Sequence, residues 1–273
     1  MRINNNLMAM NAQRNLAINA GNQAKALEKL SSGYRINRAG DDAAGLAISE
    51  KMRGQIRGLQ MASKNSQDGI SLIQTAEGAL SETHSILQRM RELSVQAAND
   101  TNVTKDRSAI KTELDQLALE VSRIANQTEF NTQKLMASGA TFSGVFQVGA
   151  NNSQTISLSI TSMTAGALGV SAADLVVSNA TDAGNTVSAI QTAIETVSQE
   201  RAKLGAMQNR LEHTIANLDT AAENLQAAES RIRDVDMAKE MMNYSKQNIL
   251  NQAATAMLAQ ANQAPQGVLQ LLR

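Results

Sequence analysis

Few residues in this chain of 273 have the type and spacing that catalysis or metal binding needs. The two histidines, His84 and His213, have no second ligand at metal spacing near either of them. The neighbouring carboxylates Asp41 and Asp42 could act as an acid–base pair. They also stand directly before a helical pattern, where a carboxylate caps the first backbone N–H groups, and that reading is favoured.

The chain contains no cysteine, which excludes a thiol nucleophile, a cysteine zinc site and a disulfide framework. No arrangement of a nucleophile with a base is recognisable elsewhere in the sequence. We therefore expect that the protein is not an enzyme and that it binds no metal and no cofactor.

The formal charge is zero overall, with 25 basic and 25 acidic side chains, but it is unevenly placed. A strong nucleic-acid binder usually carries a large positive balance, so no nucleic-acid partner is expected. Residues 1–40 hold six basic side chains and one acidic one. Basic chain ends around an acidic centre favour head-to-tail contact between copies, whereas ordinary scatter of surface charge is the simpler alternative.

No stretch reaches the roughly 18 apolar residues of a membrane span, so we expect no membrane insertion. The first six residues also lack the apolar core of a signal peptide. Both a cytoplasmic protein and one exported without a cleaved signal fit these observations.

The elements that would position any functional residue are mostly long helices. One proline and an aromatic content of 2% indicate uninterrupted, thin helical packing through aliphatic residues and alanine. Apolar residues recur at helical spacing in five segments. These predicted helices cover residues 3–32, 43–98, 104–128, 186–236 and 237–271.

The middle of the chain differs from its ends. Residues 142–148 and 155–160 alternate apolar and polar side chains around a Gly-Ala-Asn-Asn stretch, which predicts a β-hairpin at 142–160. Residues 161–184 are small and polar and predict no element. We therefore expect a mainly α fold. Long antiparallel helices from both chain ends form a coiled-coil-like bundle, and a small β-hairpin region lies in the middle.

Glycines interrupt the predicted helix at 43–98 without any proline. Each costs roughly 1 kcal/mol relative to alanine in a helix interior. They would be tolerated where another backbone must approach the helix closely. The glycines are Gly54, Gly58, Gly69 and Gly78.

A helix of about 30 residues is marginal alone and needs a partner for its apolar stripe. The helices at the two chain ends are natural partners for each other. They would form a thin pair with small residues at many contact positions. Apolar surface would be left over, which suggests that further copies of the chain cover it.

Several longer stretches resemble bacterial flagellin. The N-terminal signature runs through residues 35–50 as RINRAGDDAAGLAISE, and residues 126–131 read NQTEFN. At the other end, residues 228–238 read AESRIRDVDMA and residues 268–273 read VLQLLR. These matches occur in the right order through nearly all of 1–150 and 186–273.

The resemblance implies a structural subunit of a helical filament, in a short form that lacks the outer domains usual in the family. Residues 1–42 and 235–273 would form an inner core domain. Residues 43–160 and 186–234 would form a helical shell domain, and residues 161–185 would be a short variable segment in place of the outer domains. The resemblance places a switch between filament forms in the hairpin at 142–160.

The resemblance also implies the partners and the route out of the cell. Many copies would polymerise at the distal tip beneath a cap protein, after export by the flagellar type III apparatus to the extracellular flagellum. An export chaperone would hold the C-terminal helix, and a hook-associated junction protein would adjoin the filament.

Two sets of site residues follow. The lateral subunit contact, which is also the candidate patch for the animal Toll-like receptor for flagellin, would comprise Gln88, Arg89, Leu93 and Glu113. The packing seam of the inner core would comprise Ile3, Leu7, Met10, Leu27, Leu30, Ile249, Leu250, Met257, Leu258, Leu269 and Leu272.

Other classes of protein remain as alternatives. A hook–filament junction protein shares the helical ends, but it should lack the close match at 35–50 and 228–238. A soluble coiled-coil adaptor or a type III effector belongs to a different class, which polymerisation in high salt would distinguish. A membrane-active C-terminal helix is weakly supported, because only Lys246 and Arg273 are charged after Glu240.

Overall fold

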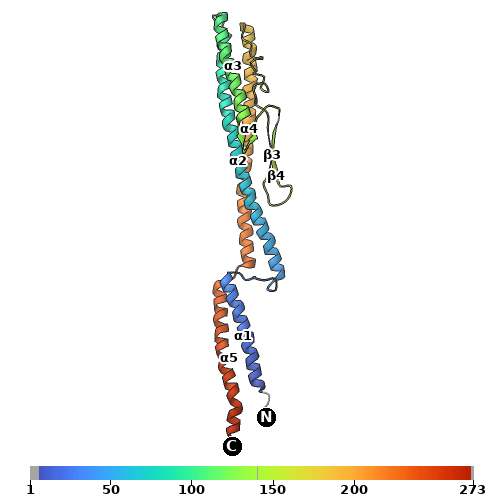
Figure 1. The fold of residues 1–273 in the computed structure, drawn as a ribbon, viewed down its shortest axis with the longest axis vertical. Coiled ribbons are helices and arrows are strands. Elements are labelled where there is room, and N and C mark those ends of the chain that lie inside the picture. The colour runs from blue at the N-terminus through green and yellow to red at the C-terminus, as the bar shows by residue number, and fades with distance from the viewer. Residues whose placement is uncertain (1–5, 140, 272–273) are drawn as a thin grey trace. The chain divides into compact units, whose positions relative to one another are not determined.

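The computed structural model describes the backbone of residues 6–139 and 141–271, and side chains as far as residue 263. The described residues form long helices and two small antiparallel sheets (Figure 1), so the predicted mainly α fold is confirmed. The helices are α1 (Leu7–Ser32), α2 (Ala43–Ala97), α3 (Thr104–Gln127), α4 (Ala180–Arg233) and α5 (Met237–Leu271). The strands are β1 (Glu129–Phe130), β2 (Gln133–Lys134), β3 (Phe142–Gln147) and β4 (Thr155–Ile160).

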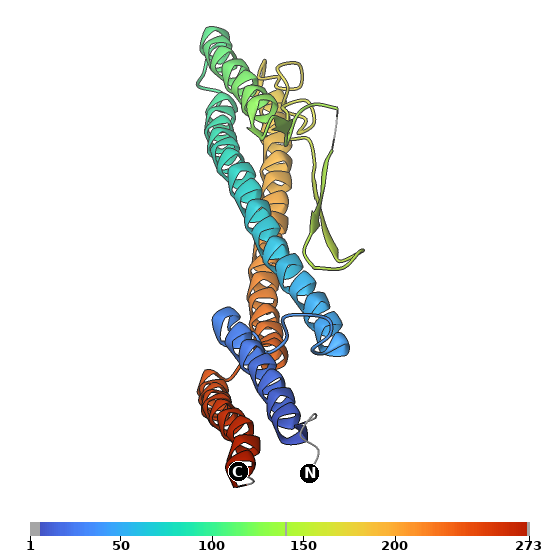
Figure 2. The same ribbon diagram turned by 60° about the horizontal axis from the view of Figure 1, so that its bottom comes forward.

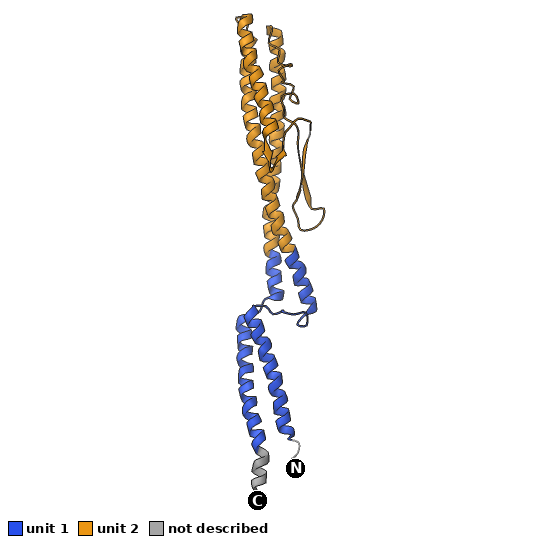
Figure 3. Ribbon diagram, in the orientation of Figure 1, with its two compact units in different colours: residues 1–54, 224–273 blue, residues 55–223 orange. Residues whose placement is uncertain are grey.

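The chain divides into two compact units, coloured separately in Figure 3. Unit 1 comprises Met1–Gly54 and Asn224–Arg273, and unit 2 comprises Gln55–Glu223. The domain boundaries expected near residues 42 and 235 lie in connectors between helices, and both connectors belong to unit 1. That these positions separate two domains stays a prediction.

In unit 1, α1 and α5 lie side by side and run in opposite directions (Figures 1 and 2). The least exposed positions alternate by three and four residues on each helix, which is the spacing of a coiled-coil seam. We call these positions the terminal seam. It consists of Ala9, Ala12, Leu16, Asn19, Gln23, Ala26 and Leu30 on α1, and Glu240, Tyr244, Gln247, Asn251, Ala254, Leu258 and Ala261 on α5.

The terminal seam is built mainly from small and polar side chains. Among the described residues of α1, only Ala26 is fully buried. Gln23 accepts a hydrogen bond from the Asn251 side chain, and the Asn6 amide donates to the Ala261 carbonyl oxygen at 2.7 Å. Polar residues in a coiled-coil seam fix register and orientation at a cost in stability. The two terminal helices are therefore well aligned but weakly held.

Unit 2 has an apolar core shared by α2, α3 and α4. Fully buried large side chains come from each of these three helices and from the β region. In β4 the burial alternates along the strand, with Ile156, Leu158 and Ile160 facing inward. Opposite them, β3 contributes Phe146 and Phe142, paired with Ile156 and Ile160. The predicted hairpin at 142–160 is thus confirmed, with one face on the core.

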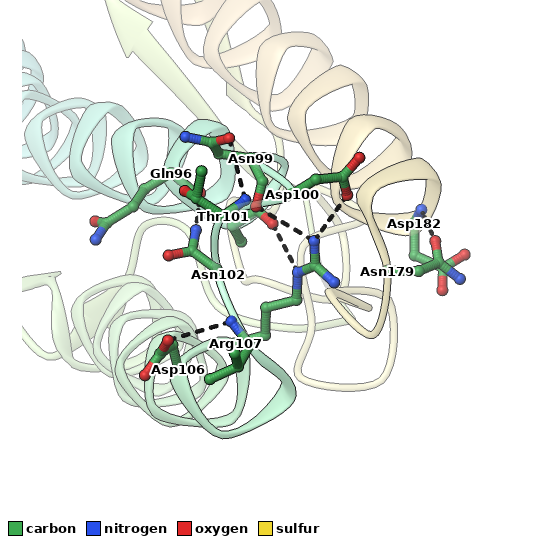
Figure 4. A network of polar contacts seen from close by, with 11 residues as sticks. Gln96, Asn99, Asp100, Thr101, Asn102, Asp106, Arg107, Asn179 and Asp182 are labelled. Carbon is green, nitrogen blue, oxygen red and sulfur yellow. Dashed lines mark hydrogen bonds and ion pairs between the residues drawn. The ribbon is translucent and has the colours of Figure 1, made fainter.

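The turn between α2 and α3 is held by one arginine (Figure 4). Arg107 donates to the carbonyl oxygens of Ala97 at 3.0 Å and Asn99 at 3.3 Å, and it pairs with Asp100 at 3.2 Å. The Asp106 carboxylate accepts from the Val103 backbone N–H at 3.2 Å, which starts α3. These contacts satisfy polar groups that the helix ends would leave without partners.

The structure differs from the sequence-based expectation after residue 160. The segment 161–179 has no regular element, yet it is well packed, because Met163, Val170 and Leu175 are buried. Helix α4 begins at Ala180, six residues earlier than predicted, and the Asn179 side chain caps it by accepting from the Asp182 N–H at 2.7 Å. This cap was not recognised in a stretch of small polar residues.

The hairpin rests on α2 through a glycine. A Cβ added at Gly58 would lie 2.8 Å from the Ala150 Cβ and 3.1 Å from its Cα, closer than side chains can pack. Nearby, the Asn65 amide donates to the Gln147 carbonyl oxygen at 3.1 Å. The expected close approach of another backbone is therefore found at Gly58. At Gly54 and Gly78 an added Cβ would meet nothing within 4 Å.

The close contact at Gly58 predicts opposite effects for two glycine substitutions in the same helix. Gly58→Ala should destabilise unit 2 by about 1–3 kcal/mol, because the hairpin loop must shift. Gly78→Ala should stabilise it by up to about 1 kcal/mol, because alanine favours the helix and meets open space. Urea unfolding followed by circular dichroism measures both, and effects of equal sign would contradict the seating of the hairpin on Gly58.

The polar pair in the terminal seam predicts a non-additive double mutant. Gln23→Leu or Asn251→Leu alone should weaken the helix pair by about 1 kcal/mol, because each leaves a partly buried amide without its partner. The double variant should recover that loss, since two leucines pack in a seam without unpaired polar groups. Thermal melts of the monomer by circular dichroism provide the comparison. Losses that simply add in the double variant would show that the two amides do not act together.

Candidate functional site

The outer sides of α1 and α5 carry a set of large apolar side chains that the terminal seam leaves exposed. Large apolar side chains left exposed in this number on two neighbouring helices are typical of a surface that binds a partner. We call this set the outer apolar face. It consists of Leu7, Met8, Met10, Ile18 and Leu27 on α1, and Met237, Met241, Met242, Ile249, Leu250 and Met257 on α5.

The predicted packing seam is only partly the seam of a single chain. Leu30 and Leu258 are half-buried in the terminal seam. Six other predicted seam residues are exposed within one chain and lie on the outer apolar face, so their packing in an inner core made by several copies stays a prediction: Leu7, Met10, Leu27, Ile249, Leu250 and Met257. Ile3 and Leu272, together with the side chain of Leu269, lie outside the described residues.

Helix geometry explains why these six side chains do not lie in the contact between α1 and α5. Apolar periodicity identifies residues that need covering, but it does not say whether the cover comes from the same chain. The α1–α5 contact uses the small residues between the large ones, as at Ala9, Ala12 and Ala26. The heptad spacing of those small residues was the signal that sequence reasoning missed.

On α5 the outer apolar face is hollowed. The hollow is a shallow depression, wide open to solvent and formed by side chains of one helix, with a mostly apolar lining and with Ser245 and Lys246 as its polar members. Its apolar lining comes from Met241, Met242, Ile249 and Leu250. Thioethers and aliphatic groups thus stand open to solvent around a concave surface.

A junction at the inner ends of α1 and α5 links the two terminal segments. The Arg35 backbone N–H donates to the Arg233 carbonyl oxygen at 2.6 Å, and the Val235 N–H donates to the Gly33 carbonyl oxygen at 3.0 Å. Gly33 has a φ of +75°, a left-handed conformation that glycine adopts without strain and that ends α1. The segment that follows α1 and the segment that precedes α5 are therefore joined by two backbone hydrogen bonds.

Charged and aromatic side chains reinforce this junction. Arg233 pairs with Glu50 at 2.8 Å, and its guanidinium carbon lies 4.8 Å from the centre of the Tyr34 ring. Only a small part of the Arg233 side chain is exposed, so this ion pair and cation–π contact are partly shielded from water. Sequence reasoning did not identify this cluster, because its members come from three separate segments.

The two neighbouring carboxylates have structural roles in the connector. Asp42 caps α2 by accepting from the Gly45 N–H at 2.8 Å, as predicted. Asp41 accepts from the backbone N–H groups of Arg38 at 3.0 Å and Asn37 at 3.1 Å, and these bonds lower its pKa. Asp41 therefore supports the connector at neutral pH, and this support is lost as the pH falls below the ordinary value of 3.8.

The histidines do not form a recognisable metal site. His84 lies 2.9 Å from the Gln88 amide nitrogen on the same helix, and His213 lines a separate surface hollow beside Arg210. Within the described part of the chain, no group of three or more His, Asp or Glu side chains could hold a metal ion.

The predicted lateral patch is only partly on the surface. Arg89 on α2 donates to Glu113 on α3 at 3.0 Å and to Glu92 at 3.2 Å, and these bonds raise the pKa of Arg89. Gln88 is also exposed. Leu93 is a correction, because its side chain is 3% exposed and belongs to the core of unit 2. Leu93 lies one helical turn after Arg89 but packs into the core, so we define the lateral patch as Gln88, Arg89 and Glu113.

Among the residues that the structure describes, no helix is sufficiently long and apolar to cross a membrane.

Comparison with known proteins identifies the family. Residues 3–141 match the model of the bacterial flagellin N-terminal helical region, and residues 187–272 match that of the C-terminal helical region. The flagellin of Halalkalibacterium halodurans is 62% identical over the full length of both chains. The flagellar filament 33 kDa core protein of Treponema phagedenis is 52% identical, again over the full length of both.

A solved structure shares the fold at much lower identity. It is that of a flagellar hook-associated protein from Vibrio parahaemolyticus, which is 14% identical with a TM-score of 0.61. The alignment covers 71% of this chain and all of the other, and at this identity it shows the fold alone. The two family models together cover well over half of the chain, and the curated relatives match it from end to end. The chain therefore belongs to the bacterial flagellin family.

Proposed function

We propose that this flagellin is the structural subunit of a bacterial flagellar filament used for swimming. The observation that carries this proposal is the outer apolar face, whose large side chains the described part of the chain leaves exposed. A heterologous contact that repeats without closing generates an open helical polymer. Other copies of the chain supply the missing cover in such a polymer.

In this proposal, assembly and folding of the terminal helices are coupled. The terminal seam holds α1 and α5 together mainly through alanine, asparagine and glutamine, so the pair gains little from apolar burial by itself. Burying the outer apolar face against neighbours adds stabilisation of roughly 25 cal/mol for each Å² of apolar surface removed from water. The helices thus become firmly ordered at the moment of incorporation.

The route and the other partners follow from membership of the family. The subunit is exported unfolded by the flagellar type III apparatus and joins the distal tip beneath a cap protein, outside the cell. An export chaperone covers the C-terminal helix before assembly, and hook-associated junction proteins adjoin the filament base. The role is structural, without catalysis or a cofactor.

Two alternatives are separated by one experiment. A hook–filament junction protein or a soluble coiled-coil adaptor would stay monomeric or form small oligomers. The proposed filament subunit should polymerise in high salt into long straight or supercoiled filaments. Electron microscopy of the salt-treated protein distinguishes these outcomes.

Deletion of residues 1–20 should abolish polymerisation and leave a soluble monomer. The deletion removes residues 7–20 of α1, which carry four of the seven terminal-seam residues of α1 and four of the five residues that α1 contributes to the outer apolar face. Sedimentation after salt treatment, followed by electron microscopy, measures the result against the full-length chain. Normal filaments from the truncated chain would show that coupled folding of the terminal helices is not needed.

A second proposed role concerns the lateral patch. It forms a lateral contact between subunits and, in the free monomer, a surface for the animal Toll-like receptor for flagellin. The exposed Arg89–Glu113 pair supports this role, because it holds the guanidinium in a defined position beside Gln88. Arginine is enriched among the residues that dominate binding energy at protein interfaces.

Arg89→Ala should lower receptor signalling by the monomer at least about tenfold, the size of effect expected for a central interface arginine. Arg123→Ala is the matched control, because Arg123, on α3, is also an exposed arginine paired with a glutamate, Glu120. A cell-based receptor assay with both purified monomers measures the effect. Unchanged signalling from Arg89→Ala would remove the receptor role while leaving the filament role untouched.

A further inference from the structure

The outer apolar face is rich in methionine. It holds six of the 13 methionines of the chain: Met8, Met10, Met237, Met241, Met242 and Met257. The chain has no cysteine, so no thiol competes for oxidants and thioethers are its main sites of two-electron oxidation. Oxidation therefore falls on methionine, and exposure decides which one reacts.

Exposure differs sharply between the methionines of the outer apolar face and those in the core of unit 2. Met241 and Met242 are 51% and 67% exposed, and both line the hollow on α5. Met90, Met136 and Met163 in the core of unit 2 are at most 1% exposed. A small peroxide in solution thus reaches the first pair directly and the second group only if unit 2 opens.

The reaction needs only a hydroperoxide as the second reactant. The thioether sulfur attacks the terminal peroxide oxygen, so an S–O bond forms as the O–O bond breaks. Sulfur loses two electrons to the peroxide, whose other oxygen leaves and is protonated. The products are methionine sulfoxide and, from hydrogen peroxide, water.

We propose that Met241 and Met242 of the unassembled subunit form a reversible oxidation site for hydroperoxides, and that their sulfoxides block incorporation into the filament. This inference rests on the proposed filament function, since it requires the outer apolar face to be buried by other copies. A sulfoxide is far more polar than a thioether, so burying it against apolar neighbours such as Ile249 and Leu250 costs free energy, even where Ser245 or Lys246 donates to its oxygen.

Assembly itself protects the site. Once neighbours cover the outer apolar face, the thioethers are shielded, so a finished filament resists an oxidant that disables the monomer. The sensitive species is the subunit before or during incorporation. Reduction by methionine sulfoxide reductase reverses the change, because sulfoxide is the reversible stage of methionine oxidation.

The test uses the full-length monomer and preformed filaments, each treated with hydrogen peroxide and then freed of it. Peptide mass spectrometry measures sulfoxide at each methionine. Met241 and Met242 should oxidise at least about tenfold faster in the monomer than in the filament, and faster than Met90, Met136 and Met163 in either state. The oxidised monomer should show a critical concentration for polymerisation raised at least about tenfold, as the cost of burying a polar sulfoxide suffices for that change. Methionine sulfoxide reductases should restore the original value.

A matched pair of variants separates this site from general damage. Met241→Leu with Met242→Leu keeps the volume and removes two of the reactive sulfurs, so it should keep more of its polymerisation after peroxide treatment than the wild type, although the four other methionines of the outer apolar face remain. Met61→Leu is the control, because Met61 is also exposed but lies on α2 in unit 2. That variant should stay as sensitive as the wild type. If the leucine double variant assembles poorly even without peroxide, rescue of the oxidised wild type by the reductases still decides the question.

The outcomes are distinct. Normal polymerisation of monomer carrying sulfoxide at both positions would overturn the proposal, as would equal peroxide sensitivity of the leucine double variant. Loss of assembly that the reductases do not repair would overturn it as well. Failure of untreated wild type to polymerise would instead contradict the filament function on which the inference rests.

Discussion

The terminal seam is the interaction on which the rest of unit 1 depends. Two long helices meet through alanine and amide side chains, with Gln23 and Asn251 hydrogen-bonded between them. Such a contact fixes which residues lie opposite one another, yet it hides little apolar surface. The large apolar side chains of the two helices must therefore point away from the seam. The exposed face and the need for further copies both follow from the choice of small residues at the seam.

Unit 2, in contrast, buries its large apolar side chains within the chain. Its leucine, isoleucine and methionine side chains are packed into one core shared by three helices, the β3–β4 hairpin and the segment 161–179. In unit 2 the hairpin approaches α2 closely at a single glycine, where Gly58 meets Ala150. In unit 1 small residues allow close approach along whole helices. The chain thus joins a part with its own core to a part that lacks one. A monomer with these properties is ordered in the middle and poorly held at its ends, which suits a subunit completed by its neighbours.

Much of the fold was predictable because little interrupts the helical pattern. Predicted ends agree with the structure within a few residues for α2, α3 and α5, where caps and connectors are recognisable. The small β1–β2 hairpin was missed, because Asn131 and Thr132 adopt positive φ at its turn without any glycine to signal it. The sites were less predictable. Periodicity alone did not separate residues facing a partner helix from residues facing other copies, and it did not reveal that Leu93 points inward while Arg89 points out.

The junction between Gly33, Arg35, Arg233 and Val235 has a mechanical consequence. Two backbone hydrogen bonds, with N···O distances of 2.6 and 3.0 Å, tie the start of one connector to the end of the other. Both terminal helices extend from this tie in the same direction, so a pull on either one loads the two bonds in shear and reaches its neighbour. Tension applied at one chain end is therefore divided between two strands of backbone. A subunit in a rotating fibre would transmit traction through both ends together, and neither end would be peeled away by itself.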